Sequence, residues 1–363
     1  MPALRVGIVG LGFGGKVHLP AFMSIPHVTV GAVCSSNASS ASQIARSFGV
    51  PEAYSNWRDL VSAHNIDAVS VAVPPAAQYE IVSGALAAGK HVLCEKPFGL
   101  HLREASGMVE AAKHRNVTAA VGFQFRMEPG ISELRRKVKS GEVGTVRRLH
   151  VVWLTRGASD PNRPWSWQND ISSGGGVLTA FGSHVIDYVQ WITGSHIQSI
   201  VTDTEILTRL RNDNFGKEKQ VTAEDSCNFI CRLVNGIDVI AAISNCCSTG
   251  LGHSIEVYGD LGRLRFFHAH PFDAPAQLVY QPIDGDEHKV TVPDLPGDAS
   301  DTRTAAFREL ARIFVESIEE RSCPDLPTFS SGLEVREVLE AARQSLQLRK
   351  WACVERNLNL SGS

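Results

Sequence analysis

The sequence predicts an α/β protein in which a doubly wound parallel sheet is followed by an α+β domain with a large, mostly antiparallel sheet. Three observations indicate this fold. Apolar strand-like runs alternate with helix-length segments up to about residue 123. Beyond it, longer strand candidates follow one another through short turns that contain Gly or Asn. The chain has 363 residues, which is enough for roughly two domains.

The first part of the chain shows the alternation that parallel sheets require. Helical patterns separate its strand candidates, and helices of this length act as crossovers that cover both faces of a parallel sheet. We therefore predict a nucleotide-binding domain over residues 1–123. Its expected strands are residues 4–9, 27–34, 66–73, 91–96 and 117–123.

The remainder, residues 124–363, is predicted to be an α+β domain for substrate binding and oligomerisation. An amphipathic helix is expected over 131–144, and the turns VNGID and GDLGR suit antiparallel hairpins. Helices over 304–321 and 333–350 close the chain and are candidates for packing back on the first domain. The expected strands lie within residues 146–156, 196–210, 226–235, 238–247, 253–260 and 262–269.

Composition argues against several classes of partner. The net charge is −3 and there is no long basic run, which disfavours nucleic acid and an anionic membrane as the main partner. No apolar run has membrane-spanning length, and no signal peptide is recognisable, so we expect a cytoplasmic protein. The eight cysteines form no C-x-x-C pair, which predicts reduced thiols rather than a zinc site or a disulfide frame.

A glycine-rich motif directly follows the first strand candidate. Gly10, Gly12 and Gly15 form G-x-G-x-x-G between a strand and a helix, the context that this fingerprint needs. The first glycine permits a tight turn, the second lets the backbone approach a pyrophosphate, and the third allows close helix–strand packing. The helix N-terminus adds free N–H groups and a positive dipole. We therefore predict a Rossmann dinucleotide site rather than a glycine-rich turn without a ligand.

The turn after the second strand candidate bears on which dinucleotide binds. An acidic residue there would accept from the ribose 2′-hydroxyl and repel a 2′-phosphate. Ser35, Ser36 and Asn37 stand here instead, and no carboxylate occurs until Glu52. They lie at an expected helix N-cap, where anions are favoured. We predict NADP, with NAD as the alternative, and a role of these side chains in capping alone stays open.

The segment GGGVLTAFGSHVIDYVQWITG (174–194) contains a candidate base. Apolar residues repeat at helical spacing from Val185, and Ser183 suits an N-cap, so we expect a helix that ends at Gly194. His184 would then lie in the first turn, where the helix dipole disfavours the imidazolium. A neutral imidazole can accept a proton from an alcohol. A core or capping histidine is the alternative.

The segment EKPFG (95–99) places a lysine at the end of an apolar strand. Ligands of open α/β sheets bind at the carboxyl ends of the strands, so Lys96 can reach the cofactor crevice. Its ammonium can donate to a substrate oxygen and stabilise a developing alkoxide. Partial burial would lower its pKa. A lysine paired with the neighbouring Glu95 is the alternative.

These motifs together resemble the glucose–fructose oxidoreductase/inositol dehydrogenase (Gfo/Idh/MocA) family over nearly the whole chain. The supporting stretches are VGIVGLGFGGKVHLPAF, VAVPP, AAGKHVLCEKP, VGFQFR, GEVG, GGGVLTAFGSHVIDYVQWITG, VYGDLGRL and TFSSGLEVREVLEAA. The resemblance implies a nicotinamide-dependent oxidoreductase acting on a sugar, cyclitol or related polyol. Lys96 matches the family lysine, whose following proline is usually in a cis peptide. His184 matches the family histidine, and Pro74 matches the proline that lines the cofactor crevice.

The chain departs from the family pattern at two positions. Many members have an aspartate four residues before the histidine, where this chain has Ala180, and often a histidine where it has Gln78. The missing aspartate leaves the proton relay open. It also keeps a second hypothesis, a catalytically weakened member that senses NADP or acts in regulation. Retention of Lys96 and His184 favours the enzyme.

The sequence thus gives a set of candidate site residues. Lys96 and His184 are the predicted catalytic residues. No metal is expected, because His268 and His270 share one strand face with no further ligand nearby. The predicted cofactor-binding residues are Gly10, Gly12, Phe13, Gly14, Gly15, Ser35, Ser36, Asn37, Val73, Pro74, Glu95 and Lys96. The candidate substrate contacts are Gln124, Arg126, Trp165 and Asp187.

Apolar residues on both faces of one strand candidate bear on assembly. Val239, Ala241 and Ile243 alternate with Ile240 and Ala242. A sheet with helices on one side needs cover on the other. We therefore predict a homodimer or homotetramer that associates through the sheet of the second domain.

Overall fold

The computed structural model describes residues 3–270, 272, 274–293, 302–320 and 323–356. By its contacts the chain divides into two units. The first runs to Met127 and takes in Arg303–Arg336, and the second comprises Glu128–Thr302 and Glu337–Arg356. The domain boundary expected at residue 123 stays a prediction.

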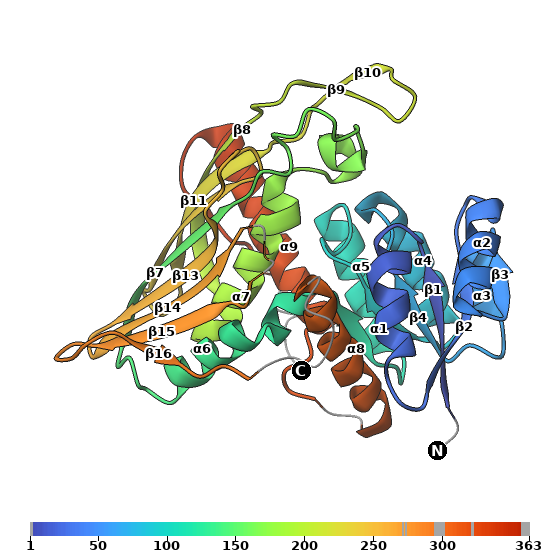
Figure 1. Cartoon of the computed structure of the whole chain (residues 1–363), viewed down its shortest axis with the longest axis horizontal. Coiled ribbons are helices and arrows are strands. Elements are labelled where there is room, and N and C mark those ends of the chain that lie inside the picture. The colour runs from blue at the N-terminus through green and yellow to red at the C-terminus, as the bar shows by residue number, and fades with distance from the viewer. Residues whose placement is uncertain (1–2, 271, 273, 294–301, 321–322, 357–363) are drawn as a thin grey trace. The chain divides into compact units, whose positions relative to one another are not determined.

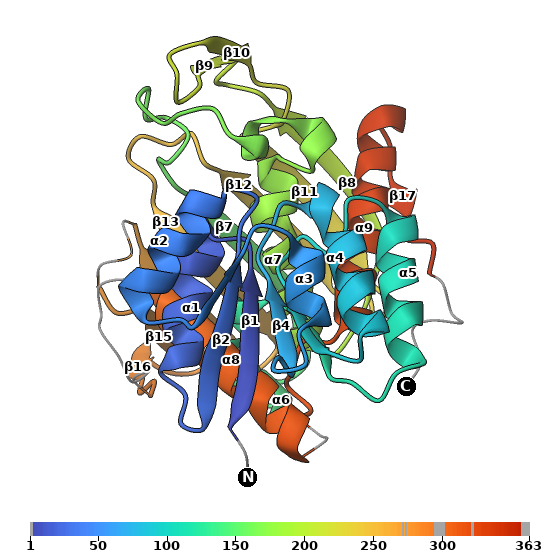
Figure 2. The same cartoon turned by 90° about the vertical axis from the view of Figure 1, so that its right-hand side faces the viewer.

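In the described part of the first unit, six parallel strands form one sheet in the order β3-β2-β1-β4-β5-β6 (Figures 1 and 2). This confirms the predicted parallel sheet. β3, which was not expected from the sequence, is a short strand at the sheet edge. The strands are β1 (Leu4–Val9), β2 (Val28–Cys34), β3 (Glu52–Tyr54), β4 (Ala68–Val71), β5 (His91–Cys94) and β6 (Ala119–Val121).

The helices of the first unit pack on this sheet and on one another. α3, α4 and α5 lie in a row, while Phe22 of α1 meets Phe314 of α8 edge to face. Val6, Ile8 and the other apolar residues of the central strands are buried, which provides the core. The helices are η1 (Gly14–His18), α1 (Leu19–Met23), α2 (Ala38–Phe48), α3 (Trp57–Ser62), α4 (Pro75–Ala87), α5 (Leu102–Lys113), η2 (Gln124–Met127) and α8 (Thr302–Glu320).

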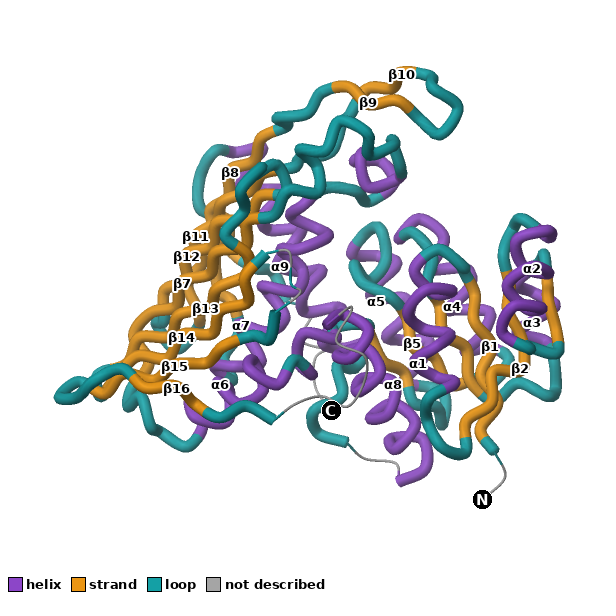
Figure 3. Tube along the Cα trace, in the orientation of Figure 1, coloured by secondary structure: helices purple, strands orange, loops and turns teal. Residues whose placement is uncertain are grey.

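The described part of the second unit is built on a nine-stranded sheet in the order β16-β15-β14-β13-β7-β12-β11-β8-β17 (Figure 3). Its pairs are antiparallel except for β12 beside β7, which confirms the predicted mostly antiparallel sheet. A second sheet pairs β9 (Leu210–Asn212) with β10 (Glu218–Gln220). The nine strands are β7 (Val146–Leu154), β8 (Ile197–Glu205), β11 (Ser226–Leu233), β12 (Asp238–Ser244), β13 (Gly252–Gly259), β14 (Gly262–Ala269), β15 (Gln277–Pro282), β16 (His288–Val290) and β17 (Ala352–Cys353).

Helices cover one face of the large sheet, where α6 and α7 lie side by side (Figure 1). Strand β11 shows the result, since Cys227, Phe229 and Cys231 are buried while Ile230 and Arg232 are exposed. The sheet therefore has a covered and an open face. The helices are α6 (Pro129–Lys139), η3 (Trp167–Asn169), η4 (Ile171–Ser173), η5 (Leu178–Gly182), α7 (Ser183–Thr193) and α9 (Phe329–Leu348), whose last part belongs to this unit.

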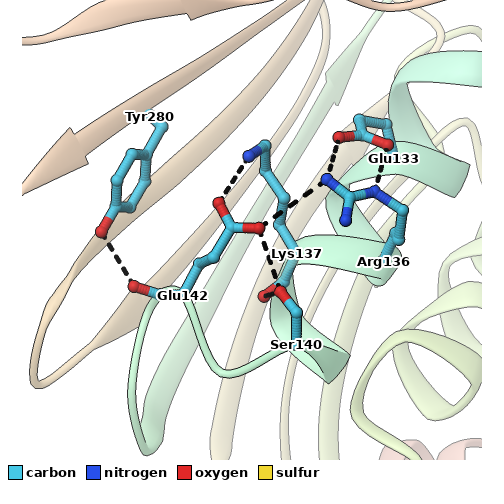
Figure 4. Close-up of polar contacts among 6 residues, drawn as sticks. All are labelled: Glu133, Arg136, Lys137, Ser140, Glu142 and Tyr280. Carbon is cyan, nitrogen blue, oxygen red and sulfur yellow. Dashed lines mark hydrogen bonds and ion pairs between the residues drawn. The ribbon is translucent and has the colours of Figure 1, made fainter.

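A cluster of polar contacts holds the end of α6 against the sheet (Figure 4). Lys137 binds the Glu142 carboxylate at 2.5 Å, and Ser140 donates to the same carboxylate at 3.0 Å. These hydrogen bonds keep the pKa of Glu142 below its usual value, with the bond to Lys137 contributing most. Tyr280 of β15 donates to the backbone carbonyl of Glu142 at 2.8 Å. The turn after α6 is thereby tied to β15, the strand next to the edge of the sheet.

Candidate active site

The carboxyl ends of the parallel strands bring most of the predicted cofactor residues to one edge of the first sheet. Gly10 follows β1, Ser35 follows β2 and Glu95 follows β5. Backbone bonds continue past the strands here, since Gly10 N–H donates to Cys34 C=O and Glu95 N–H donates to Val71 C=O. This edge is where open α/β sheets bind their ligands.

The glycine loop has a geometry that suits a dinucleotide. Gly10 has φ +93°, and a Cβ there would lie 2.3 Å from the carbonyl oxygen of Ala72. At Gly12 a Cβ would meet no atom within 4 Å, so the backbone is open to an approaching group. At Gly15, the third glycine of the motif, a Cβ would lie 3.2 Å from Cδ1 of Ile44, and at the neighbouring Gly14 it would lie 2.9 Å from the Cβ of Ala72. These are the tight turn, the open backbone and the close packing that a pyrophosphate-binding loop needs, so the residues fit the cofactor.

The turn after β2 uses its polar side chains partly for capping. Asn37 is the N-cap of α2, and its side-chain oxygen accepts from Ser40 N–H at 3.1 Å. The Ser35 hydroxyl accepts from Asn37 N–H at 3.2 Å, while Ser36 is exposed. Glu52, the next carboxylate along the chain, accepts a hydrogen bond from the Asn65 side chain at 2.7 Å. The turn therefore presents neutral side chains.

Lys96 stands on the turn that follows β5, two residues past Cys94, the last residue of the strand. The peptide bond between Lys96 and Pro97 is cis, as the family resemblance implies. Burial lowers the pKa of the Lys96 ammonium, and the charge of the adjacent Glu95 partly opposes this effect. The lysine is half-buried. A partly desolvated ammonium at this sheet edge suits a group that binds a substrate oxygen.

Glu95 is held by buried neighbours that the sequence did not single out. The fully buried His18 bonds Ser70 Oγ through Nδ1 at 2.7 Å and Glu95 Oε1 through Nε2 at 3.3 Å. Its ring stacks on Phe307 with centroids 3.9 Å apart. A Cβ at Gly122 would lie 2.4 Å from the Glu95 carboxylate, so the glycine makes room for it. The motif V-H-L-P in the sequence was the available signal for this histidine.

The predicted residues around Lys96 occupy neighbouring elements. Pro74 is the N-cap residue of α4, and Val73 C=O accepts from Gln78 at 3.4 Å. Gln124 and Arg126 lie in η2 and are both buried. Their role as substrate contacts stays a prediction.

The helix that carries His184 begins earlier than predicted. Ser183 was expected as N-cap, but it has helical dihedrals (φ −59°, ψ −39°) and follows directly on η5. His184 is the second residue of α7 and so lies in the first turn of that helix as predicted. The π-helical η5 precedes α7 without a break, however, so the argument from the dipole of a helix N-terminus does not apply. The predicted helix end is confirmed, since Gly194 is a left-handed C-cap. π-helical segments such as η5 often occur at functional sites.

Aromatic side chains surround His184, which is buried. The ring of Trp153 on β7 lies 6.2 Å from His184 and stacks on His253 at 4.3 Å. His253 bonds the Tyr188 hydroxyl at 3.0 Å. Burial lowers the pKa of His253 to about 3. Asp187 is buried on the same helix, and its candidate substrate role stays a prediction.

The glycine run before η5 forms a fixed anchor for this helix. Glu224 accepts from Leu178 N–H at 3.0 Å, and its backbone carbonyl accepts from Val177 N–H at 2.9 Å. Gly176 has φ +106°, and a Cβ there would lie 2.2 Å from a carboxylate oxygen of Glu224. Ala180 N–H donates to Gly176 C=O at 2.9 Å. A carboxylate thus binds the start of the helical segment, one turn ahead of Ala180.

Two further candidates lie outside these clusters. Trp165 donates through Nε1 to Gln220 C=O at 3.1 Å, and the Lys219 ammonium lies 4.4 Å from its ring centroid. One face of that ring is therefore occupied, and its substrate role stays a prediction. His268 bonds the Ala274 carbonyl at 2.9 Å. In the described residues no group of three metal-ligating side chains gathers, and no helix is both long and apolar enough to cross a membrane.

The comparisons with known proteins match both units. Residues 4–123 match the family model described as oxidoreductase family, NAD-binding Rossmann fold, and residues 131–265 match the GFO/IDH/MocA C-terminal domain. The chain belongs to the Gfo/Idh/MocA oxidoreductase family. The predicted family and fold are thereby confirmed, as is the expectation of an oxidoreductase with a Rossmann domain of the NAD-binding type. The family description does not address the predicted preference for NADP over NAD.

Relatives of this Gfo/Idh/MocA chain span nearly its whole length. An uncharacterized oxidoreductase of Synechocystis is 29% identical and covers 97% of the chain and 96% of its own length. The levoglucosan dehydrogenase of Pseudarthrobacter phenanthrenivorans is 27% identical over 73% of the chain and 74% of its own length. A crystal structure of an oxidoreductase domain protein from Kribbella flavida superposes with a TM-score of 0.88 at 27% identity, covering 98% of this chain and 100% of that one.

Proposed function

We propose that this protein transfers hydride between a nicotinamide dinucleotide and a hydroxyl-bearing carbon of a sugar, cyclitol or related polyol. The observation that carries the proposal is the meeting of the open glycine loop and the partly desolvated Lys96 at one edge of one sheet. The similarity to a levoglucosan dehydrogenase supports a sugar-like substrate.

The chain divides the work between its two parts in this proposal. Residues 1–123 form the nucleotide-binding domain, and residues 124–363 form the substrate and oligomerisation domain. The loop Gly10–Gly15, the turn at Ser35–Asn37 and the backbone near Pro74 and Glu95 hold the dinucleotide. When bound, it supplies the nicotinamide ring that exchanges a hydride with the substrate carbon.

Lys96 and His184 handle the substrate hydroxyl. The His184 imidazole accepts the hydroxyl proton, and the Lys96 ammonium donates a hydrogen bond to the oxygen as negative charge develops on it. In reduction the same imidazole, protonated, returns the proton to the oxygen. This assignment requires the ammonium of the first unit and the imidazole of the second to reach one substrate.

The decisive experiment follows nicotinamide absorbance with a panel of sugars and cyclitols. Lys96→Ala and His184→Asn should each lower kcat by about 10²- to 10³-fold, because each removes a group that acts on the reacting oxygen. The exposed Lys139 and His64 provide controls, and Lys139→Ala and His64→Asn should leave kcat unchanged. Full turnover in Lys96→Ala on a confirmed substrate would refute the proposal.

NADP is the proposed dinucleotide, since the turn after β2 presents Ser35, Ser36 and Asn37 and no carboxylate. A titration that compares NADP with NAD tests this directly. Ser35→Asp should shift preference toward NAD, because a carboxylate repels the 2′-phosphate. Ser62→Asp, at the end of α3, is the control. Tighter NAD binding by the unaltered protein would reverse the assignment.

A regulatory dinucleotide sensor is the second candidate. Ala180 stands where many family members have an aspartate beside the histidine. Tight NADP binding without turnover on any sugar or cyclitol would favour this function. The retained Lys96 and His184 argue for the enzyme.

A further inference from the structure

A buried glutamine bridges the two ends of the turn that carries Lys96. Gln78 lies on α4 and has 0% exposure. Its Nε2 donates to the Glu95 carbonyl at 2.8 Å, and its Oε1 accepts from Gly99 N–H at 2.8 Å. Nε2 also donates to the Val73 carbonyl at 3.4 Å. The donor and acceptor atoms of one side-chain amide are thus all engaged with backbone.

These bonds take the place of the interstrand hydrogen bonds that stop at the end of β5. β5 ends at Cys94, so the backbone from Glu95 to Gly99 leaves the sheet while staying largely buried. Buried backbone groups need partners, because an unsatisfied donor or acceptor that has lost its contact with water destabilises the folded state. Gln78 supplies partners at both ends of the turn. Arg336 of α9, which is also buried, donates to the carbonyls of Phe98 and Gly99.

The two side chains do different things for the turn. Arg336 binds carbonyls that follow the cis peptide, whereas Gln78 binds Glu95 directly before Lys96 and Gly99 three residues after it. Gln78 therefore links the strand side of the turn to its far side. The α4 helix itself has no need of an amide here, because its other buried positions, such as Ile81 and Val82, are apolar.

We propose that Gln78 is the positioning residue that fixes the Lys96 ammonium for the reaction. The inference rests on the proposed function, in which that ammonium binds the substrate oxygen. A shift of about 1 Å in a catalytic group can cost about 100-fold in rate. Gln78 touches only backbone in these bonds, so its effect on the reaction passes through the turn and Lys96.

The test combines Gln78→Met with Lys96→Ala in the full-length protein and measures kcat and the KM for the dinucleotide. Gln78→Met keeps the length of the side chain and removes all its hydrogen bonds. We expect kcat to fall by about 10- to 100-fold with the dinucleotide KM changed by less than about threefold. In the Lys96→Ala background Gln78→Met should cause no further loss, since the group it positions is gone. Gln43→Met on the exposed side of α2 is the matched control.

Two results would overturn the inference. One is a Gln78→Met protein with undiminished kcat while Lys96→Ala has lost activity, and the other is an equal loss from Gln78→Met with and without Lys96. If circular dichroism shows that Gln78→Met does not fold, Gln78→His, which keeps polar nitrogens near the turn, is measured in its place. A Gln78→His protein that retains more than half of the wild-type kcat, and whose effect on kcat is the same with and without Lys96, counts against the positioning role. Undiminished kcat in Lys96→Ala itself contradicts the proposed function instead.

Discussion

At the residue scale, buried polar side chains decide where the reactive groups of each unit lie. In the first unit His18 bonds the Glu95 carboxylate, and Gln78 bonds the backbone of Glu95 and Gly99 on either side of Lys96. In the second unit Glu224 binds the start of the helical segment that carries His184. Such side chains are costly to bury unless every polar atom has a partner, so they report constraints on geometry rather than stability alone.

His253 gives the second unit a stability that depends on pH. Its folded pKa is about 3 against 6.5 for an ordinary histidine, because burial and the nearby His268 disfavour the charged ring. The unfolded chain therefore binds more protons below pH 6.5, and stability present above that pH is lost as pH falls. Between pH 7 and pH 5 this group should lower the free energy of unfolding by about 2 kcal/mol.

Urea unfolding at the two pH values checks this expectation. His253→Gln removes the titrating ring, so the variant should lose less stability between pH 7 and pH 5 than the unaltered protein. An equal loss in both proteins would assign the pH dependence to other groups.

Gly176 is a second position where a single substitution should measurably lower the stability of the protein. Its φ of +106° disfavours a side chain, and an added Cβ would lie 2.2 Å from the Glu224 carboxylate. Gly194 at the other end of the same helix has φ +63° and open space around it. Both substitutions to Ala should destabilise by about 1–2 kcal/mol for the backbone alone. Gly176→Ala should lose clearly more in thermal unfolding, and equal losses would contradict the contact with Glu224.

At the scale of elements, the predicted end of the helix that carries His184 was correct and its predicted start was not. Gly194 is a left-handed C-cap at the end of α7, where a glycine was expected to end the helix, and Gly49 ends α2 in the same conformation. Ser183 had the right residue type for an N-cap, but the chain is already helical from Leu178. The start is set instead by Gly176 and Glu224, which are far apart in sequence.

The N-cap of α2 allows a test between helix capping and cofactor binding, the two roles that the sequence left open for Asn37. Asn37 accepts from Ser40 N–H, so Asn37→Ala should lower stability by about 1 kcal/mol. Ser36→Ala, at an exposed neighbouring position, is the control and should change stability little. Thermal unfolding and NADP titration of both variants check this. Lost NADP affinity without lost stability in Asn37→Ala would mean that the side chain serves the cofactor rather than the helix.

At the scale of the whole molecule, the open face of the large sheet is the proposed site of self-association. Ile230 and Ile240 are paired across β11 and β12 and are 39% and 37% exposed. Arg232 and Asp238 on the same strands form an ion pair of 2.9 Å. A face that joins apolar residues with charges of both signs suits a second copy of itself.

Light scattering at micromolar concentration should give a dimer or tetramer for the unaltered protein. The double variant Ile230→Glu, Ile240→Glu should shift it toward the monomer, because paired carboxylates repel across the interface. Val234→Glu, at an exposed position beyond the end of β11, should leave the assembly unchanged. A monomeric unaltered protein would rule out this interface.

The sequence by itself determined the alternation of strands and helices, the glycine loop, the lysine motif and the family. These features are local, because hydrophobic periodicity, turn glycines and short motifs are written in neighbouring residues. Only the tertiary structure decided that Gln78 and Arg336 hold the turn of Lys96, and that Glu224 rather than Ser183 sets the start of the helix of His184. Those contacts join residues far apart along the chain, and a buried polar atom takes its partner from whatever the fold brings beside it.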